Sequence, residues 1–249
     1  MKSFHGIVTA IGLIAIWQGI VWATQLPDFM LPGPLPVLEV AIAKHALILK
    51  HAGVTMAEIL LGLALGTGLG GLSALTLIAF RPARLWLMPV IVASQSLPVF
   101  ALAPLLTLWL GYGLWSKVAM ATLIIYFPVT SAFYDGLRRT EAGWIDLAKT
   151  MGATRWALLR RIRIPAALPS FASGLRVATA IAPIGAVVGE WVGSSAGLGY
   201  LMLHANGRLQ TDLLFAAMLT LALIAVALYF VTDRILRRLI RWQPETVTN

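Results

Sequence analysis

Long apolar runs are the feature of this sequence that most restricts how the chain can fold. About 20 apolar residues in an α-helix, rising ~1.5 Å per residue, cross the ~30 Å hydrocarbon layer of a membrane. Because the runs are continuous rather than alternating, they predict spanning helices rather than spanning strands. We expect an all-α, polytopic membrane protein with about six transmembrane helices, at Ile7–Ala23, Val54–Phe80, Trp86–Leu110, Lys117–Phe133, Phe171–Val192 and Leu213–Val231.

The overall composition agrees with this expectation. Of the 249 residues, 59% are hydrophobic and 12% are charged, whereas soluble domains are usually about 45–50% apolar. The first run could instead be a cleaved signal peptide behind Lys2, but the run is long and no small-residue cleavage pattern follows Trp22. The sequence contains no cysteine, which excludes disulfides, thiolate metal sites and cysteine nucleophiles.

The basic residues indicate how the helices are oriented. With a cytoplasmic N-terminus, fourteen of the nineteen Lys and Arg residues fall on the cytoplasmic side, Arg176 lies inside a span near its cytoplasmic end, and only Lys44, Lys50, Lys117 and Arg208 fall outside. This asymmetry follows the positive-inside rule and predicts that both termini are cytoplasmic. Nucleic-acid binding is another common reason for a pI near 10.5, but here the basic residues flank the apolar runs and form no groove-reading motif.

The chain is expected to form a single transmembrane domain, 1–249. Residues 1–53 hold the first span and an outer segment, residues 54–235 hold the core with a cytoplasmic loop at 135–169, and residues 236–249 form a cytoplasmic tail. Within the outer segment, Leu38–His51 predicts an amphipathic helix at the membrane interface. Four prolines before it predict an extended path rather than a helix: Pro27, Pro32, Pro34 and Pro36.

Several short patterns resemble catalytic or nucleotide motifs without their usual setting. The stretch GTGLGG matches a dinucleotide-binding pattern but lies in the middle of an apolar run. Gly62, Gly66 and Gly70 recur every four residues and instead predict a face on which two helices pack closely. The sequence has no G-x-x-x-x-G-K-[ST] loop, no metal-ligand spacing among its four histidines and no carboxylates paired within a span. We therefore expect neither an enzyme nor a metal site.

Charged residues inside apolar runs are the first candidates for function, because a charge at the bilayer centre costs at least ~2.5–3.5 kcal/mol. Glu58, Arg176 and Glu190 qualify, although each could simply pair with a neighbour. The stretches SQSLPVFALAP and WVGSSAGLGY also interrupt helices with Pro, Gly and polar residues, as backbone that lines a cavity does. The predicted translocation path comprises Gln95, Ser96, Pro98, Glu190, Ser194 and Ser195.

The stretch DLAKTMGATRWALLRRIRIP, Asp146–Pro165, gathers charge in an otherwise apolar chain. Its apolar residues fall roughly on one helical face: Leu147, Met151, Leu158 and Ile162. Gly152 interrupts the pattern and Thr154 can cap a new helix, so we expect two short cytoplasmic helices that meet at Gly152. A basic loop held on anionic lipid explains the charge but not the ordered apolar face. Such a face with a charged rim suits a groove on a soluble partner.

The same stretch resembles the EAA loop of bacterial ABC-importer permeases, whose pattern is E-A-A, three residues, Gly, nine residues, then I-x-L-P. Asp146–Ala148 stands at E-A-A, Gly152 keeps its place, and Ile162–Pro165 stands at I-x-L-P, with Asp, Leu and Ile as departures. LGLALGTGLG, SLPVFALAPLLTLWLGYG, PAALPSFASGLRVA and GEWVGSSAGLGYL resemble permeases of the nitrate, sulfonate and taurine branch. The resemblance covers roughly Thr55–Trp242.

This resemblance implies a type I ABC-importer permease fold in the bacterial inner membrane. In that family two permease copies face each other, a periplasmic binding protein delivers the solute, and each loop docks on a cytoplasmic ATPase that holds ATP and Mg²⁺. The implied partners are the ATPase, the binding protein, a second copy and lipid, with no nucleic acid and no cofactor on this chain. The implied ATPase-docking residues are Asp146, Leu147, Ala148, Met151, Gly152, Ala153, Arg155, Leu158, Ile162 and Pro165.

The substrate is indicated by GEWVGSSAGLGYLMLHANGRLQTDLLFAAM, which is most similar to permeases for pyrimidine precursors of thiamine. A path with Glu190, Trp191 and Tyr200 suits a neutral or cationic aromatic amine better than a small anion. We expect a hydroxymethylpyrimidine-like solute, with an aliphatic sulfonate, taurine or nitrate as the alternative. A secondary transporter is the alternative of another class, but it should show inverted repeats and a mid-membrane ion site, which this sequence does not.

Overall fold

The computed structural model describes residues 2–96 and 98–242. The regular elements in these two ranges are all helices, which confirms the expected all-α chain. In chain order they are α1 (Lys2–Thr24), α2 (Pro34–Ala43), α3 (His45–Ala79), α4 (Arg81–Ser96), α5 (Val99–Leu110), α6 (Leu114–Arg138), α7 (Ala142–Thr150), α8 (Arg155–Leu158), the π-helix η1 (Leu159–Arg163), α9 (Ile164–Gly193), α10 (Leu198–Gly207) and α11 (Thr211–Leu239).

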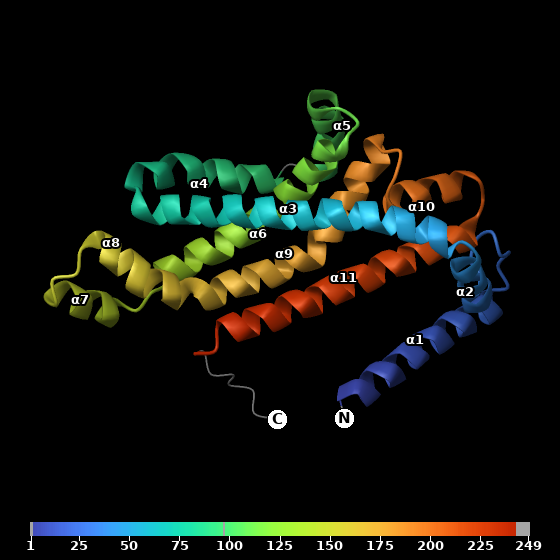
Figure 1. Ribbon diagram of the computed structural model, residues 1–249, viewed down its shortest axis with the longest axis horizontal. Coiled ribbons are helices and arrows are strands. Elements are labelled where there is room, and N and C mark those ends of the chain that lie inside the picture. Colours follow the sequence, from blue (N-terminus) through green and yellow to red (C-terminus); the bar gives the residue numbers. More distant parts are fainter. Residues whose placement is uncertain (1, 97, 243–249) are drawn as a thin grey trace.

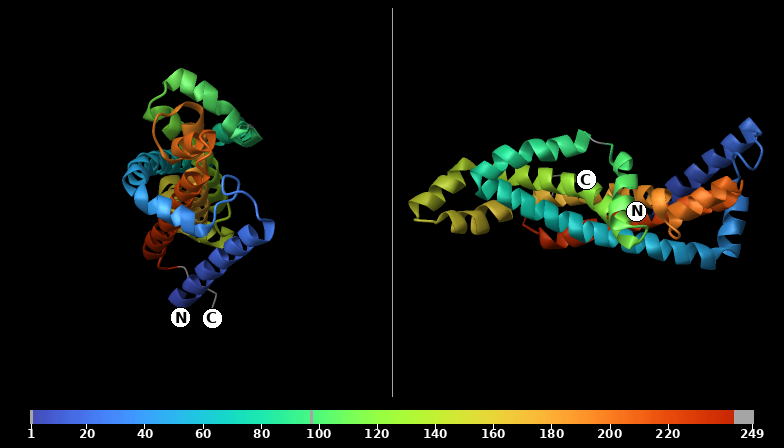
Figure 2. Two further views of the ribbon diagram at one scale, coloured as in Figure 1. Left: turned by 90° about the vertical axis from the view of Figure 1, so that its right-hand side faces the viewer. Right: turned by 90° about the horizontal axis from the view of Figure 1, so that it is seen from above.

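The helices form an elongated bundle in which α3, α6, α9 and α11 run along the long axis (Figure 1). The short helices α7 and α8 lie at one end, and α2 and α10 lie at the other (Figures 1 and 2). Helix α6 packs extensively against both α3 and α9. Apolar side chains of these three helices form the centre of the core: Ile59, Ala121, Ile125, Val129, Ala178, Ala182 and Ala186.

Small residues let α3 approach α6 closely. Gly62, Gly66 and Gly70 are buried and face α6 at successive turns. A Cβ atom would lie 2.5 Å from Ala121 at the first of these positions and 2.6 Å from Ile125 at the second, both closer than real atoms approach. The missing side chains therefore set the distance between α3 and α6, as in other small-xxx-small helix pairs.

Four helical stretches are long and apolar enough to cross a membrane: His45–Ala79, Leu114–Arg138, Arg155–Gly193 and Thr211–Leu239. They contain four of the six predicted spans. The first predicted span lies in α1, whose apolar part is Val8–Thr24. Most large apolar side chains of α1 are exposed and the helix contacts the rest of the chain sparsely, which suits a helix surrounded by lipid.

The predicted span Trp86–Leu110 is not one helix. Helix α4 ends at Ser96, and α5 begins at Val99 with Pro98 as its extended N-cap. Proline has no N–H with which to continue α4, and it disfavours helical backbone in the residue before it. The two helices also have different neighbours, because α4 packs on α3 whereas α5 packs on α6 and α9 (Figure 1).

The proline-rich outer segment differs from its predicted extended path. Pro34 and Pro36 lie in the first turn of α2, where a missing N–H costs no intrahelical hydrogen bond. The single helix expected over Leu38–His51 is also wrong. Helix α2 ends at Ala43, Lys44 has non-helical backbone, and the following residues form the first two turns of α3.

Arg176, a charge inside a predicted span, joins α9 to α11. Its Nε donates a hydrogen bond to Oδ1 of Asp233 at 2.6 Å. The Nε of Arg237 donates to Oδ2 of the same carboxylate at 2.7 Å. Asp233 thus lies between two guanidinium groups, so the structure gives the charge of Arg176 a partner within the bundle.

Candidate functional site

The segment between α6 and α9, residues 139–163, is here called the loop segment. Its first helix, α7, ends in a pair of hydrogen bonds in which Gly152 N–H donates to Lys149 O and Ala153 N–H donates to Ala148 O, each at 2.9 Å. This Schellman arrangement requires left-handed backbone at Gly152, where φ is +77°. Glycine adopts this conformation without the clash that a Cβ atom brings. Gly152 is therefore the point at which the loop segment turns.

The second half of the loop segment begins at Thr154, whose Oγ1 accepts a hydrogen bond from Ala157 N–H at 3.2 Å and caps α8. The expectation of a separate second short helix is wrong, because α8 continues through η1 into α9. The π-turn lies directly before Pro165, which has no N–H to offer the carbonyl four residues earlier. The N–H of Ile164 donates to Leu159 O, five residues earlier, which is the hydrogen-bond spacing of a π-helix.

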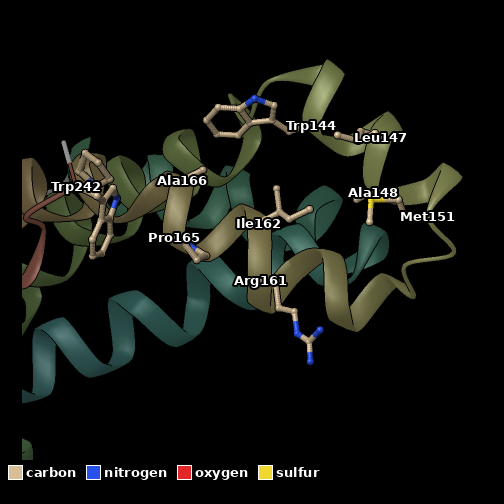
Figure 3. A pocket seen from close by; sticks show the side chains of 10 residues that line it. Trp144, Leu147, Ala148, Met151, Arg161, Ile162, Pro165, Ala166 and Trp242 are labelled. Carbon is tan, nitrogen blue, oxygen red and sulfur yellow. The ribbon is translucent and has the colours of Figure 1, made fainter. Parts of the chain in front are cut away.

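An apolar groove of about 650 Å³ lies between α7 and the start of α9 (Figure 3). Its lining residues are Trp144, Leu147, Ala148, Met151, Arg161, Ile162, Pro165, Ala166, Pro169 and Trp242. Ile162 points toward α7, while the guanidinium of Arg161, the only charged group in this set, extends away from Trp144 (Figure 3). The groove therefore presents an apolar surface with a basic edge.

Half of the predicted docking residues line this groove: Leu147, Ala148, Met151, Ile162 and Pro165. The other half lie outside the lining: Asp146, Gly152, Ala153, Arg155 and Leu158. Leu147 is 62% exposed and Met151 is 79% exposed, although both side chains are apolar. Asp146 pairs with Lys149 at 3.0 Å on the surface, where such a pair adds little stability.

The sequence interpretation missed the two tryptophans of the groove. Trp144 precedes Leu147 by three residues and Met151 by seven, which is the spacing of one helical face, so that pattern could have revealed it. Trp242 follows the last spanning helix and meets the groove only through the fold. No local pattern in the sequence marks it.

The opposite end of the bundle contains a buried carboxylate. Glu190, near the end of α9, is 1% exposed, and Thr55 donates to its Oε1 at 2.6 Å. Its Oε2 accepts from the N–H groups of Gly199 at 2.5 Å and Tyr200 at 3.2 Å. A negative charge at a helix N-terminus satisfies free N–H groups and complements the helix dipole. Glu190 therefore caps α10.

Two residues of α3 complete this cap. The ring Nδ1 of His51 accepts from Gly197 N–H at 2.9 Å, and Oγ1 of Thr55 accepts from Leu198 N–H at 2.8 Å. The three side chains His51, Thr55 and Glu190 are here called the α10 anchor. Gly197 has a φ of +111°, and a Cβ atom there would overlap the carboxyl group of Glu190. The glycine thus leaves room for the anchor.

A buried lysine lies beside the α10 anchor. Lys117 is 2% exposed and donates to Gly113 O at 2.8 Å, to Gly193 O at 2.7 Å and to Tyr112 O. Gly193 is the last residue of α9, so the cation lies at the negative end of that helix. The carboxyl groups of Glu58 and Glu190 lie nearby. Buried charges persist only with such partners, since each loses its hydration.

The predicted path residues occupy different settings. Pro98 and Ser195 are exposed, Ser194 is half-buried, and Glu190 is buried. Ser194 Oγ donates to Ala196 O at 2.6 Å, which closes the short turn between α9 and α10. The side chains of Gln95 and Ser96 lie outside the part of the chain whose side chains are described. A role of these residues in a path stays a prediction.

Curated relatives match this chain over most of its length. A probable ABC transporter permease of Haemophilus influenzae is 54% identical over 92% of this chain and 93% of its own. The formylaminopyrimidine transport permease ThiX of Halalkalibacterium halodurans is 37% identical over 94% and 93%. The riboflavin transport permease RibX of Chloroflexus aurantiacus is 38% identical over 95% and 89%.

The fold is also known from solved transporters. A chain of the MetNI methionine ABC transporter matches with a TM-score of 0.68 at 20% identity, over 79% of this chain and 97% of that chain. The expected type I ABC-importer permease fold is thereby confirmed. Proteins of this kind are non-enzymatic membrane subunits. A family model matches residues 66–243, more than half of the chain, and the protein belongs to the family of binding-protein-dependent transport system inner membrane components.

Proposed function

We propose that this chain is the permease subunit of an ATP-driven importer for a small nitrogen heterocycle, specifically a hydroxymethylpyrimidine-like thiamine precursor. The observation that carries the substrate proposal is the similarity, along nearly the whole chain, to the permease named for formylaminopyrimidine transport. The relative named for riboflavin transport supports the broader class, because riboflavin is also a flat nitrogen heterocycle. An aliphatic sulfonate or nitrate is the alternative that an experiment must separate.

Aromatic groups at the α10 end of the bundle support a flat solute. Trp191 is half-exposed at the end of α9. The ring of Tyr200 lies 5.8 Å from that of His51 and 3.9 Å from that of His204, measured between centroids. Stacked aromatic rings favour a planar partner over a small tetrahedral anion.

The loop segment supports the proposed ATPase contact. Its groove places exposed Leu147 and Met151 beside the partly exposed Trp144, and exposed apolar surfaces of this kind mark sites of protein–protein contact. The chain has no nucleotide-binding loop, so ATP and Mg²⁺ belong to the partner ATPase in this proposal. The remaining proposed partners are a soluble binding protein, the lipid bilayer and a second copy of the permease.

The orientation proposal places the loop segment in the cytoplasm, with both termini on that side. Basic residues within the loop segment support it, since the positive-inside rule retains them in the cytoplasm: Arg155, Arg160, Arg161 and Arg163. The α10 end then faces outward. We propose that the path runs past the helix interruptions at this end, along Gln95, Ser96, Pro98, Ser194 and Ser195, with Glu190 in its wall.

Single cysteines test both orientation and path, because the native chain has none. In intact cells a membrane-impermeant thiol reagent should label Ser195→Cys and leave Arg160→Cys unlabelled. In inverted vesicles, which expose the cytoplasmic face, Arg160→Cys should become reactive, whereas Ser195→Cys should react only with reagent enclosed in the lumen, at a rate that changes when ATP is added outside. Labelling of Arg160→Cys in intact cells would overturn the orientation and, with it, the ATPase contact.

Deletion of the gene tests the substrate. In a strain that cannot make the thiamine pyrimidine itself, the deletion should abolish growth on low concentrations of the pyrimidine precursor, and plasmid-borne permease should restore growth. Uptake of the labelled precursor should fall at least about tenfold. Growth on taurine or alkanesulfonate as sole sulfur source is the matched control and should be unchanged. Loss of that growth, with precursor uptake intact, would replace the pyrimidine with a sulfonate.

A further inference from the structure

The start of α10 is held entirely by side chains from other helices. A helix leaves its first N–H groups without partners, and a residue at its own N-terminus usually caps them. Here the N-cap is Gly197, which has no side chain, and the caps come from Glu190 in the preceding helix and from two α3 residues far away in sequence. The separations are 146 residues for the His51 bond and 143 for the Thr55 bond. The direction of α10 is therefore set by α3 and α9.

Thr55 has the central place in the α10 anchor. Its hydroxyl donates to Glu190 at 2.6 Å and accepts from Leu198 at 2.8 Å, so one group joins α3 to both α9 and α10. Thr55 is 0% exposed, and no water can replace either bond without entering the core. His51, at 8% exposed, forms the edge of the same anchor.

The anchor also fixes the turn between α9 and α10. This turn is held at one end by Lys117, which bonds to Gly193 O, and at the other by His51, which bonds to Gly197 N–H. Within it, Ser194 closes the chain on Ala196 O. The exposed Ser195 therefore lies on a turn that is fastened at both ends by side chains of α6 and α3.

We propose that Thr55, His51 and Glu190 are positioning residues for solute passage, because they fasten the turn that presents Ser194 and Ser195. They act through the backbone of this turn. The expected effect on transport rests on the path proposed above. The fastening itself is a property of this chain and can be measured without any substrate.

The test compares hydroxyl removal with hydroxyl retention at Thr55. In the Ser195→Cys background, Thr55→Val should raise the thiol-labelling rate about tenfold, because two hydrogen bonds that restrain the turn are lost. Thr55→Ser keeps the hydroxyl and should label like the parent. Thr179→Val is the matched control, since Thr179 is also 0% exposed but, among the described residues, its hydroxyl bonds to Leu175 O within its own helix. It should leave the rate unchanged.

Transport is the second readout. Thr55→Val should reduce ATP-driven uptake about tenfold at an unchanged amount of permease in the membrane, and Thr55→Ser should restore uptake. Equal labelling rates in Thr55→Val and Thr55→Ser would overturn the fastening. Altered labelling with normal uptake would overturn its role in passage. If the wild-type complex transports no pyrimidine, the substrate proposal fails while the labelling result still decides the fastening.

A second pair of variants decides the proposal if Thr55→Val does not accumulate. His51 lies at the edge of the anchor, so its replacement disturbs the core less. His51→Leu removes the acceptor for Gly197 N–H and should accelerate labelling of Ser195→Cys, whereas His51→Asn retains a side-chain acceptor and should not. Equal rates in these two variants would contradict the proposal.

Discussion

Gly152→Val is expected to reduce ATP-driven uptake at least about tenfold while the permease still inserts into the membrane. The φ of +77° at this position is unfavourable for a β-branched residue, at a cost of ~1–3 kcal/mol. No atom of the described residues lies within 4 Å of where a Cβ would stand, so the effect comes from the backbone and not from crowding. The altered turn would misalign α7 with the start of α8. Uptake and co-purification of the ATPase measure the result.

Gly152→Asn is the matched control for this prediction. Asparagine tolerates left-handed backbone better than other residues with a side chain, so this variant should keep most of the uptake and the ATPase contact. Normal uptake by Gly152→Val would show that the turn geometry is not needed for coupling. Equal loss in both variants would point to side-chain bulk at the ATPase contact.

Gly197→Ala is expected to lower the amount of folded permease in the membrane and to reduce its thermal stability by several degrees. The new Cβ would overlap the Glu190 carboxyl group, and the φ of +111° is one that residues with a side chain rarely adopt. If Glu190 moved away, it would leave Thr55, Gly199 and Tyr200 without their acceptor. Unpartnered buried donors cost about 1–3 kcal/mol each.

Gly207→Ala controls for the loss of a glycine in the same helix. This last residue of α10 is exposed and has nothing within 4 Å of a Cβ atom, so alanine should be neutral or slightly stabilising. Thermal unfolding in detergent, followed by fluorescence-detected size exclusion, compares the two variants. Equal stability of Gly197→Ala and wild type would show that the α10 anchor tolerates displacement of Glu190.

The helical membrane architecture could be predicted because its signals are local. Each long apolar run carries its own evidence, and the glycines at 62, 66 and 70 show their helical spacing without reference to the partner helix. Gly152 likewise indicates the end of one helix, and Thr154, two residues later, indicates the start of the next. Such features can be predicted from the short stretch of sequence in which they occur.

The connections between distant segments could not be predicted in the same way. The sequence shows that Glu190 is an unusual charge in an apolar run, but its donor Thr55 is 135 residues away. In the sequence Lys117 is one more basic residue on the predicted outer side. The hydrogen bond from its ammonium group to the carbonyl of Gly193 becomes visible only in the folded chain. The extended path predicted from Pro34 and Pro36 was wrong for a different reason. Proline breaks a helix in its interior but is accepted in its first turn.

Helix α9 contains Pro183, and Figure 1 shows the helix changing direction in its second half. Its first half is tied to α11 through Arg176 and Asp233, whereas its last turn is tied to α3 and α6 through Glu190 and Lys117. A proline supplies no N–H to the turn before it, so α9 can bend at Pro183, as at Pro169, without breaking a main-chain hydrogen bond there. Pro183 therefore separates the part of α9 that continues from the loop segment from the part that carries Glu190, and the angle between these two parts can differ without the loss of a main-chain hydrogen bond at this proline.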